Sequence, residues 1–396
     1  MKGKKLLAGI MSAALVLCTM AIPAFADETA VAKIGDTEYT SLKEAMQAAC
    51  NMNVVDVNGV PTQTTAVTVE LINDIAITDG ISVRGGSVNT YGEHYVHNIN
   101  ITLKGNKHKI DTGVHHSDIN GPTRVPLIEF VSAGGKFTVE NVIAPNVLLF
   151  RVMRPEDAVS QCGHGQPLCD PAESLLVENC TFYGSNNGYI YGVKSVTYRN
   201  NKFLLTENAN DNSEAYPLWY NFQYGLPSTF TFDGNIVNSQ RPVQLCRMIN
   251  NENIIITNNK FTVTNSDKAA KGGAIMFASI DGYKGNVTFS GNTVNAYSTI
   301  IIYAPSDNNT NFNLTIGNNT LENKTKLIGY NEWSGSYQNE ETKATAETLI
   351  KNFESKVNSW ESDTDSGYYM VGKTKYGMMR FMFKTEPTGT VTASGI

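Results

Sequence analysis

The 396-residue chain has little cysteine, little charge and no basic run. Six cysteines are present and five remain after the leader described below, an odd and low number that excludes a disulfide-built scaffold. The formal net charge is −6. An acidic chain of this kind is a poor candidate for binding nucleic acid. Beyond the leader no segment is long and apolar enough to cross a bilayer, so we expect no membrane span.

Residues 1–26 have the pattern of a secretory signal peptide. Lys2, Lys4 and Lys5 precede an apolar stretch, and Ala24 and Ala26 supply the small residues of a cleavage site. Loss of these three lysines lowers the formal net charge from −6 to −9. We therefore expect a secreted, extracellular protein that is either soluble or associated with the cell surface.

A six-residue phrase recurs seven times, with an apolar residue at each end and Asn or Gly at its third position. Asn and Gly reach positive φ at the least cost, so each phrase predicts a tight bend. We expect the bends to stack at one corner, where their amides could bond to one another as a ladder. The third positions are Asn141, Asn179, Asn200, Gly234, Asn258, Gly291 and Asn318.

Short strands surround each phrase. Apolar residues alternate before it, as in Phe230 and Phe232, which is the pattern of a strand with one buried face. A further apolar run, such as 300–303, lies between successive phrases. An antiparallel protein would instead need hairpin dipeptides, which do not separate these strands. The repeat predicts an all-β solenoid over residues 54–330. Its form would be a right-handed parallel β-helix with three strands per coil.

A solenoid needs closed ends, and each end has a candidate cap. In residues 27–53 a strand precedes a helix over 40–49, with Thr40 or Ser41 as N-cap. Residues 331–396 contain a helical pattern over 346–360 and then a strand pair. The sequence therefore predicts a short helical cap at each end. The absence of a sorting motif near residue 396 leaves open that a downstream segment is missing.

Three stretches, 31–46, 70–77 and 101–110, resemble the first coils of secreted right-handed parallel β-helix proteins of the pectate-lyase-like superfamily, in the form common on Gram-positive bacteria. The resemblance covers about residues 31–325 and implies the β-helix fold. It does not select an activity, because the superfamily contains lyases, hydrolases, epimerases and non-catalytic adhesins.

The catalytic phrases of that superfamily are incomplete in this chain. Residues 163–165, Gly-His-Gly, resemble a polygalacturonase motif, but its partner phrases are missing. Inverting hydrolysis needs two carboxylates about 6.5–9.5 Å apart, and the chain has no Asp-Asp pair. Arg154-Pro155 and Arg241-Pro242 approach a pectate-lyase phrase without matching it. Catalytic residues therefore stay unknown, and calcium is implied as a cofactor only for a lyase.

Histidine and cysteine offer two further candidate sites. Five of the six histidines lie at 94, 97, 108, 115 and 116. They lack helical spacing and Cys or carboxylate partners, so we interpret them as surface histidines and predict no metal site. Cys162 and Cys169 bracket one loop closely enough to form a disulfide, and both the paired and unpaired states stay open.

The third strands carry large residues beside inserted loops. Coils stack about 4.8 Å apart, so such residues would form a strip suited to sugar rings, although some of them will point inward. We predict a monomer that binds a polysaccharide or other glycan without cleaving it. The alternative is a polysaccharide lyase or glycoside hydrolase with a non-standard site on the loop-bearing face. The candidate ligand-binding residues are Arg151, Tyr189, Tyr191, Trp219, Tyr220, Arg247 and Tyr303.

Overall fold

The computed structural model of the chain describes most of the predicted solenoid and four short segments after it. The described residues are 29–52, 66–83, 98–114, 127–132, 134–153, 172–185, 188–191, 193–205, 216–223, 228–246, 251–264, 273–278, 283–296, 298–303, 313–322, 326–331, 361–362, 368–371, 380–383 and 391–394.

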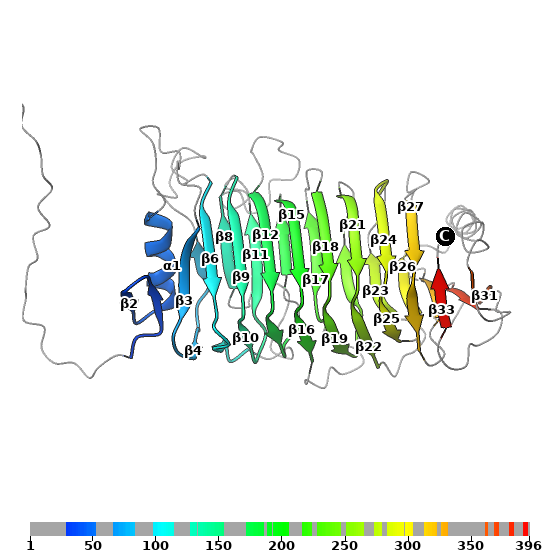
Figure 1. Cartoon of the computed structure of the whole chain (residues 1–396), viewed down its shortest axis with the longest axis horizontal. Coiled ribbons are helices and arrows are strands. Elements are labelled where there is room, and N and C mark those ends of the chain that lie inside the picture. The colour runs from blue at the N-terminus through cyan, green and yellow to red at the C-terminus, as the bar shows by residue number, and fades with distance from the viewer. Residues whose placement is uncertain are drawn as a thin grey trace, which may run out of the picture.

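The chain is mostly β, with long parallel sheets that run the length of the molecule (Figure 1). The first sheet has the order β2 (Thr37–Tyr39), β1 (Ala32–Ile34), β3 (Val67–Leu71), β6 (Asn100–Lys104), β9 (Lys136–Glu140), β12 (Ala172–Glu178), β15 (Val193–Arg199), β18 (Ser228–Asp233), β21 (Asn251–Thr257), β24 (Asn286–Ser290) and β27 (Asn313–Gly317). The second has the order β10 (Ile143–Ala144), β13 (Thr181–Phe182), β16 (Lys202–Leu204), β19 (Ile236–Ser239), β22 (Lys260–Val263), β25 (Thr293–Asn295), β28 (Asn319–Leu321), β33 (Val391–Ser394) and β30 (Glu361–Ser362).

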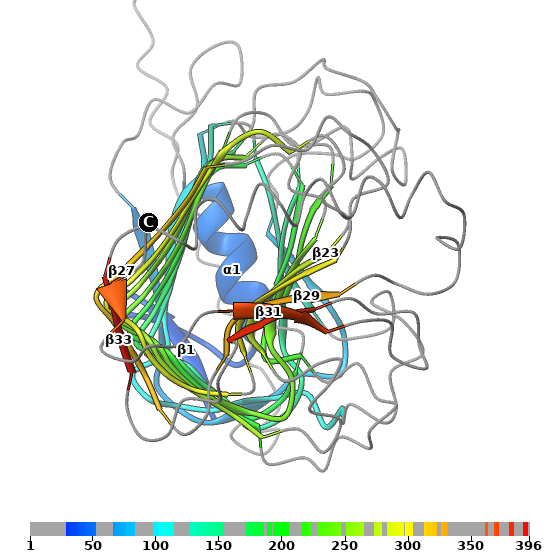
Figure 2. The ribbon, with the colours of Figure 1, turned by 90° about the vertical axis from the view of Figure 1, so that its right-hand side faces the viewer.

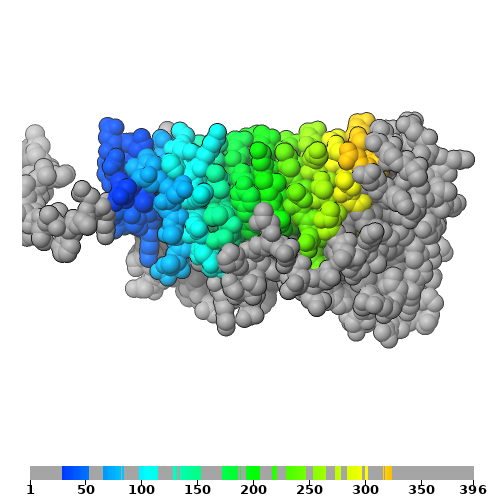
Figure 3. Space-filling view, turned by 90° about the horizontal axis from the view of Figure 1, so that it is seen from below, coloured from blue at the N-terminus to red at the C-terminus, as the bar shows by residue number. Residues whose placement is uncertain are grey.

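The third sheet has the order β29 (Lys326–Asn331), β26 (Ser298–Tyr303), β23 (Gly273–Ala278), β20 (Val243–Cys246), β17 (Trp219–Gln223), β14 (Gly188–Tyr191), β11 (Leu149–Met153), β8 (Leu127–Val131) and β5 (Ile81–Val83). Two small pairs complete the described strands, β4 (Ile75–Ala76) with β7 (Ile110–Asp111) and β31 (Tyr368–Val371) with β32 (Arg380–Phe383). Parallel neighbours in each long sheet are three elements apart in chain order. In Figure 3 the described segments accordingly follow one another in chain order along the axis.

The hydrophobic core lies inside, between the three long sheets (Figure 2). Phe230 and Phe232 of β18 are fully buried, whereas the residue between them, Thr231, is partly exposed. Aromatic rings also stack from one strand level to the next, with the Phe261 ring centroid 6.1 Å from that of Phe232 and 6.2 Å from that of Phe289. The predicted alternation of buried and outer positions is confirmed for these strands.

The seven third-position residues form one corner, between the first and second sheets. All have positive φ, from 55° at Asn141 to 68° at Gly291. Their backbone N–H groups donate to the next level, as from Asn200 to the Asp233 carbonyl (3.0 Å) and from Asn258 to the Ser290 carbonyl (3.1 Å). A side chain at Gly291 would have its Cβ 2.7 Å from the Asn258 Oδ1 atom, so these positions lie directly above one another. The predicted stack of bends is confirmed.

The amide ladder is formed by the next residue, the fourth, in the last five phrases, so its predicted position was wrong. The Nδ2 group of Asn201 donates to Asn235 Oδ1 (3.1 Å), that of Asn235 to Asn259 (3.0 Å), and the series continues through Asn292 to Asn319. These side chains are buried because the positive-φ bend turns them inward. Each ladder oxygen also accepts the backbone N–H of the fourth-position residue one level earlier, as in the 2.8 Å bond from Asn235 to Asn259. The buried amides therefore have their partners within the ladder.

The N-terminal cap is α1 (Leu42–Asn51), which closes the end of the core (Figure 2). The side chain of Ser41 is the N-cap and accepts the Glu44 N–H at 3.4 Å. The apolar face of this helix is buried in the core, at Leu42, Ala45, Met46 and Ala49. The helix expected over 346–360 lies outside the described residues.

Candidate functional site

The outer face of the third sheet is the place where the structure brings several predicted site residues together. On β11, Phe150 and Val152 are in the core, and Arg151 between them points outward with its side chain 26% exposed. On β17, Tyr220 is in the core and Trp219 lies outside it, half-buried. In the backbone register Tyr189 is opposite Arg151. A single face thus carries a guanidinium and an indole.

Arg151 is paired with a carboxylate on the neighbouring strand. Its Nη2 group donates to Glu129 Oε2 on β8, and the register places the two residues opposite each other. The Glu129 side chain is only 5% exposed. A carboxylate this deeply buried needs an opposite charge, because burial without one is costly. Among the described strands of this sheet, Glu129 is the one acidic residue.

Trp219 is hydrogen-bonded to Cys246 of the next strand, β20, and lies opposite Gln244 in the backbone register. The indole Nε1–H donates to Cys246 Sγ at 3.3 Å, and Gln244 Nε2 donates to the same sulfur at 2.9 Å. Gln244 is 8% exposed and Cys246 is 6% exposed. Beside them Tyr216, Met276 and Ile301 form a second apolar cluster, separate from the core. The face therefore changes from charged near β8 and β11 to apolar near β23 and β26.

Three buried polar atoms on the outer face of this sheet have no hydrogen-bond partner among the described residues. They are Arg151 Nε, Gln244 Oε1 and Thr299 Oγ1. Thr299 precedes core residue Ile300 on β26, so alternation places it on the same side as Ile301 of the outer cluster. Buried polar groups are normally paired, so three such atoms in one sheet require a physical explanation. Together they offer a donor, an acceptor and a hydroxyl that can act as either.

The prediction that Tyr220 binds ligand was wrong. Its side chain is fully buried, with its ring centroid 6.0 Å from that of Tyr198 and 4.8 Å from that of Phe230. Burial also raises the pKa of its hydroxyl well above the usual value. An inward ring cannot contribute to an outer strip, because neighbouring strand residues point to opposite faces.

The remaining predicted residues are only partly described. Tyr189 and Tyr191 are strand positions of β14, and Tyr303 is the last residue of β26. Arg247 lies outside the described residues, as do Cys162 and Cys169 of the expected disulfide and four of the five clustered histidines. The roles predicted for these residues therefore stay predictions.

Three residues of the face were missed by the sequence reasoning, namely Glu129, Gln244 and Thr299. Two of them, Glu129 and Gln244, had a signal in the sequence. Glu129 lies between Ile128 and Phe130, and Gln244 lies between Val243 and Leu245. A polar residue inside an apolar strand run indicates an outward position with a buried environment.

The outer face of the first sheet provides a contrast, because its polar groups pair along the axis. Lys104 Nζ lies 3.7 Å from Glu70 Oε2, and Arg199 Nη2 lies 2.6 Å from Glu178 Oε2. Thr257 Oγ1 donates to Asp233 Oδ1 at 2.6 Å. No side-chain atom described on this face is both buried and unpartnered. The unpaired atoms therefore distinguish the third sheet from the first.

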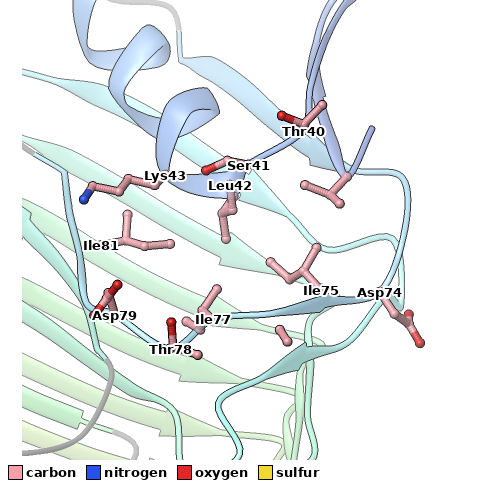
Figure 4. A pocket seen from close by; sticks show the side chains of 12 residues that line it. Thr40, Ser41, Leu42, Lys43, Asp74, Ile75, Ile77, Thr78, Asp79 and Ile81 are labelled. Carbon is pink, nitrogen blue, oxygen red and sulfur yellow. The ribbon is translucent and has the colours of Figure 1, made fainter. Parts of the chain in front are cut away.

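A pocket of about 320 Å³ opens beside the N-terminal cap (Figure 4). Leu42, Ile75 and Ile81 are the buried apolar residues of its lining, and hydroxyl and charged groups come from Ser41, Lys43, Thr78 and Asp79. Asp74 lies at its edge. The Lys109 backbone N–H and the His108 ring bond to this carboxylate and lower its pKa, against the opposing effect of desolvation. None of the unpartnered buried side-chain atoms described above belongs to this pocket.

Within the described part of the chain, no three His, Cys, Asp or Glu side chains are grouped so as to hold a metal ion. No helix described there is long and apolar enough to span a membrane. No protein-family model matches the chain, and searches of curated proteins and of solved structures found no match.

Proposed function

We propose that this protein is a secreted or cell-surface right-handed parallel β-helix of the pectate-lyase-like kind, which binds polysaccharide on the outer face of its third sheet without cleaving it. The three-element interval between neighbouring strands supports three strands per coil. The stacked bends and the inward asparagine ladder support the same reading, because both recur once per level of the stack.

The observation that carries the proposed function is the set of unpartnered buried atoms on this face. A sugar hydroxyl can accept a hydrogen bond from Arg151 Nε and donate one to Gln244 Oε1. With Thr299 Oγ1, a sugar hydroxyl can either donate or accept a hydrogen bond. Satisfying a buried polar group recovers about 1–3 kcal/mol. The half-buried Trp219 ring adds an apolar surface of the kind that packs against a sugar ring.

The ion pair between Glu129 and Arg151 favours the alternative function, a polysaccharide lyase or glycoside hydrolase. A buried carboxylate beside a guanidinium is a common part of a catalytic site. Hydrolysis by either stereochemical route uses a second carboxyl group, and the described strands of this sheet contribute Glu129 alone. We therefore place non-catalytic binding first.

A panel of plant and host polysaccharides tests the proposal, with and without calcium. The expected result is saturable binding of at least one neutral or weakly charged glycan, without new reducing ends or unsaturated products. Product formation that is lost in Glu129→Gln would establish the enzymatic alternative. Absence of binding to the whole panel would contradict the proposed function.

A further inference from the structure

The side chains of Gln244 and Cys246 lie in direct contact on the outer face of the third sheet. They are two residues apart on β20, so strand alternation points both outward. The distance from Gln244 Nε2 to Cys246 Sγ is 2.9 Å. The carboxamide carbon Cδ is covalently bonded to that nitrogen, which brings an electrophilic carbon next to a thiol.

We propose that Gln244 and Cys246 form an internal thioester. The sulfur attacks Cδ of Gln244, the Sγ–Cδ bond forms and the Cδ–Nε2 bond breaks. The thiol proton leaves with the amide nitrogen as ammonia. Nothing is oxidised or reduced, so the reaction needs no co-reactant.

The surroundings of the pair favour this reaction in two ways. Both residues are more than nine-tenths buried, which holds the thiol against the amide and limits hydrolysis of the product by water. The Trp219 Nε1–H, 3.3 Å from Sγ, stabilises negative charge on sulfur as the thiolate attacks.

The unpartnered oxygen of Gln244 is a second observation that points to this bond, beside the contact between Nε2 and Sγ. Oε1 is buried and accepts no hydrogen bond from a described residue. An amide oxygen in that position is costly. A thioester carbonyl oxygen is a weaker acceptor than an amide oxygen, so the same burial costs less once the bond has formed. The proposed chemistry therefore accounts for an atom that the hydrogen-bond network leaves without a partner.

The thioester would make this face an acylating surface. A primary amine or a hydroxyl that reaches Cδ would take the acyl group of Gln244, and Cys246 would leave as a thiol. The protein would thereby become covalently attached to the nucleophile. This inference requires no glycan, and it gives Gln244 Oε1 a different role from the one in the proposed polysaccharide binding, where that oxygen accepts a sugar hydroxyl.

Intact-mass measurement of the purified, non-reduced protein tests the bond directly. The wild type should be lighter than its sequence mass by one ammonia, apart from any hydrogens lost in disulfides. Peptide mapping should place the loss in the segment that holds Gln244 and Cys246. Unfolding in methylamine should convert Gln244 to its methylamide and release one thiol. Cys246→Ser and Gln244→Ala should lack the deficit, and Cys180→Ala, at a buried thiol elsewhere, should retain it.

Three results would overturn the inference. They are a wild-type segment with unmodified Gln244 and Cys246, a deficit that persists in Cys246→Ser, and a Cys246 found in a disulfide. If a variant fails to fold, mapping of the wild-type segment still decides. Since none of these readouts involves glycan, they can fail while polysaccharide binding succeeds, and the reverse also holds.

Discussion

Arg151 on β11 and Glu129 on β8 face each other across neighbouring strands, and the guanidinium donates to the carboxylate. Glu129 is nearly fully buried and Arg151 is partly exposed. The pair thus connects a buried negative charge to the surface on which we place ligand binding. It also leaves the Arg151 Nε group with a hydrogen still to donate.

Replacing Arg151 with methionine should destabilise the protein, because Glu129 would remain buried without its counter-charge. Fully buried pairs cost about 3–5 kcal/mol to break, and we expect a fraction of this since Arg151 is partly exposed. Arg199→Met, in the exposed pair with Glu178, should cost at most about 1 kcal/mol. Chemical denaturation measures both, and equal effects would contradict the buried role of Glu129.

The asparagine ladder predicts a strong difference between adjacent residues. Asn259→Ala removes the oxygen that accepts both the N–H and the Nδ2 group of Asn235, so two buried donors lose their partner. At about 1–3 kcal/mol each, the loss should reach several kcal/mol. Asn258→Gly should change the unfolding free energy by less than about 1 kcal/mol, because glycine readily adopts its φ of 56°. The prediction fails if the two variants unfold at the same denaturant concentration.

Alkaline pH should weaken the fold through Cys180. Burial is the main cause that raises the pKa of this thiol from 9.0 to about 12. Below the unfolded pKa both states are protonated and the thiol has no pH effect. Between the unfolded and folded values only the unfolded chain loses its proton, so stability falls as pH rises. Cys180→Ala should flatten the decline in unfolding free energy above about pH 9. An unchanged slope would show that the thiol is not shielded from solvent.

Trp219 should contribute to glycan binding chiefly through its ring. Trp219→Phe keeps an aromatic face but loses the Nε1–H that bonds Cys246, so binding should weaken only a few-fold. Trp219→Ala should abolish most of the glycan binding. It should also lower the stability somewhat, because the ring packs against Tyr216. Glycan titration and thermal unfolding of both variants separate these effects. Equal binding by all three proteins would remove Trp219 from the site.

The corner of the fold could be predicted from sequence because positive φ selects Asn and Gly. Asn also occupies the fourth position in five phrases, which suggests a ladder there. The sequence does not show, however, which of the two adjacent amides points inward. Cys180 occupies a ladder position and donates its backbone N–H to Asn201 Oδ1, which no motif indicates.

The candidate site was harder to predict, because one residue of register decides which side chains point outward. Trp219 and Tyr220 are neighbours of similar chemistry, yet only Tyr220 enters the core. The apolar residue Leu218, two positions before Tyr220, is also buried. Its position in the alternation indicates that Tyr220, and not Trp219, points inward. Unpartnered atoms such as Gln244 Oε1 depend on the arrangement of several strands and have no sequence signal.

The most direct test of polysaccharide binding on the third sheet compares matched variants on two faces of the same protein. Arg151→Lys keeps the charge beside Glu129 but removes the Nε donor, and Thr231→Val changes one hydroxyl on the outer face of the first sheet. Calorimetric titration with the best ligand of the polysaccharide panel should show binding reduced at least several-fold in Arg151→Lys and unchanged in Thr231→Val. Unchanged binding in Arg151→Lys, or an equal loss in both variants, would contradict the assignment.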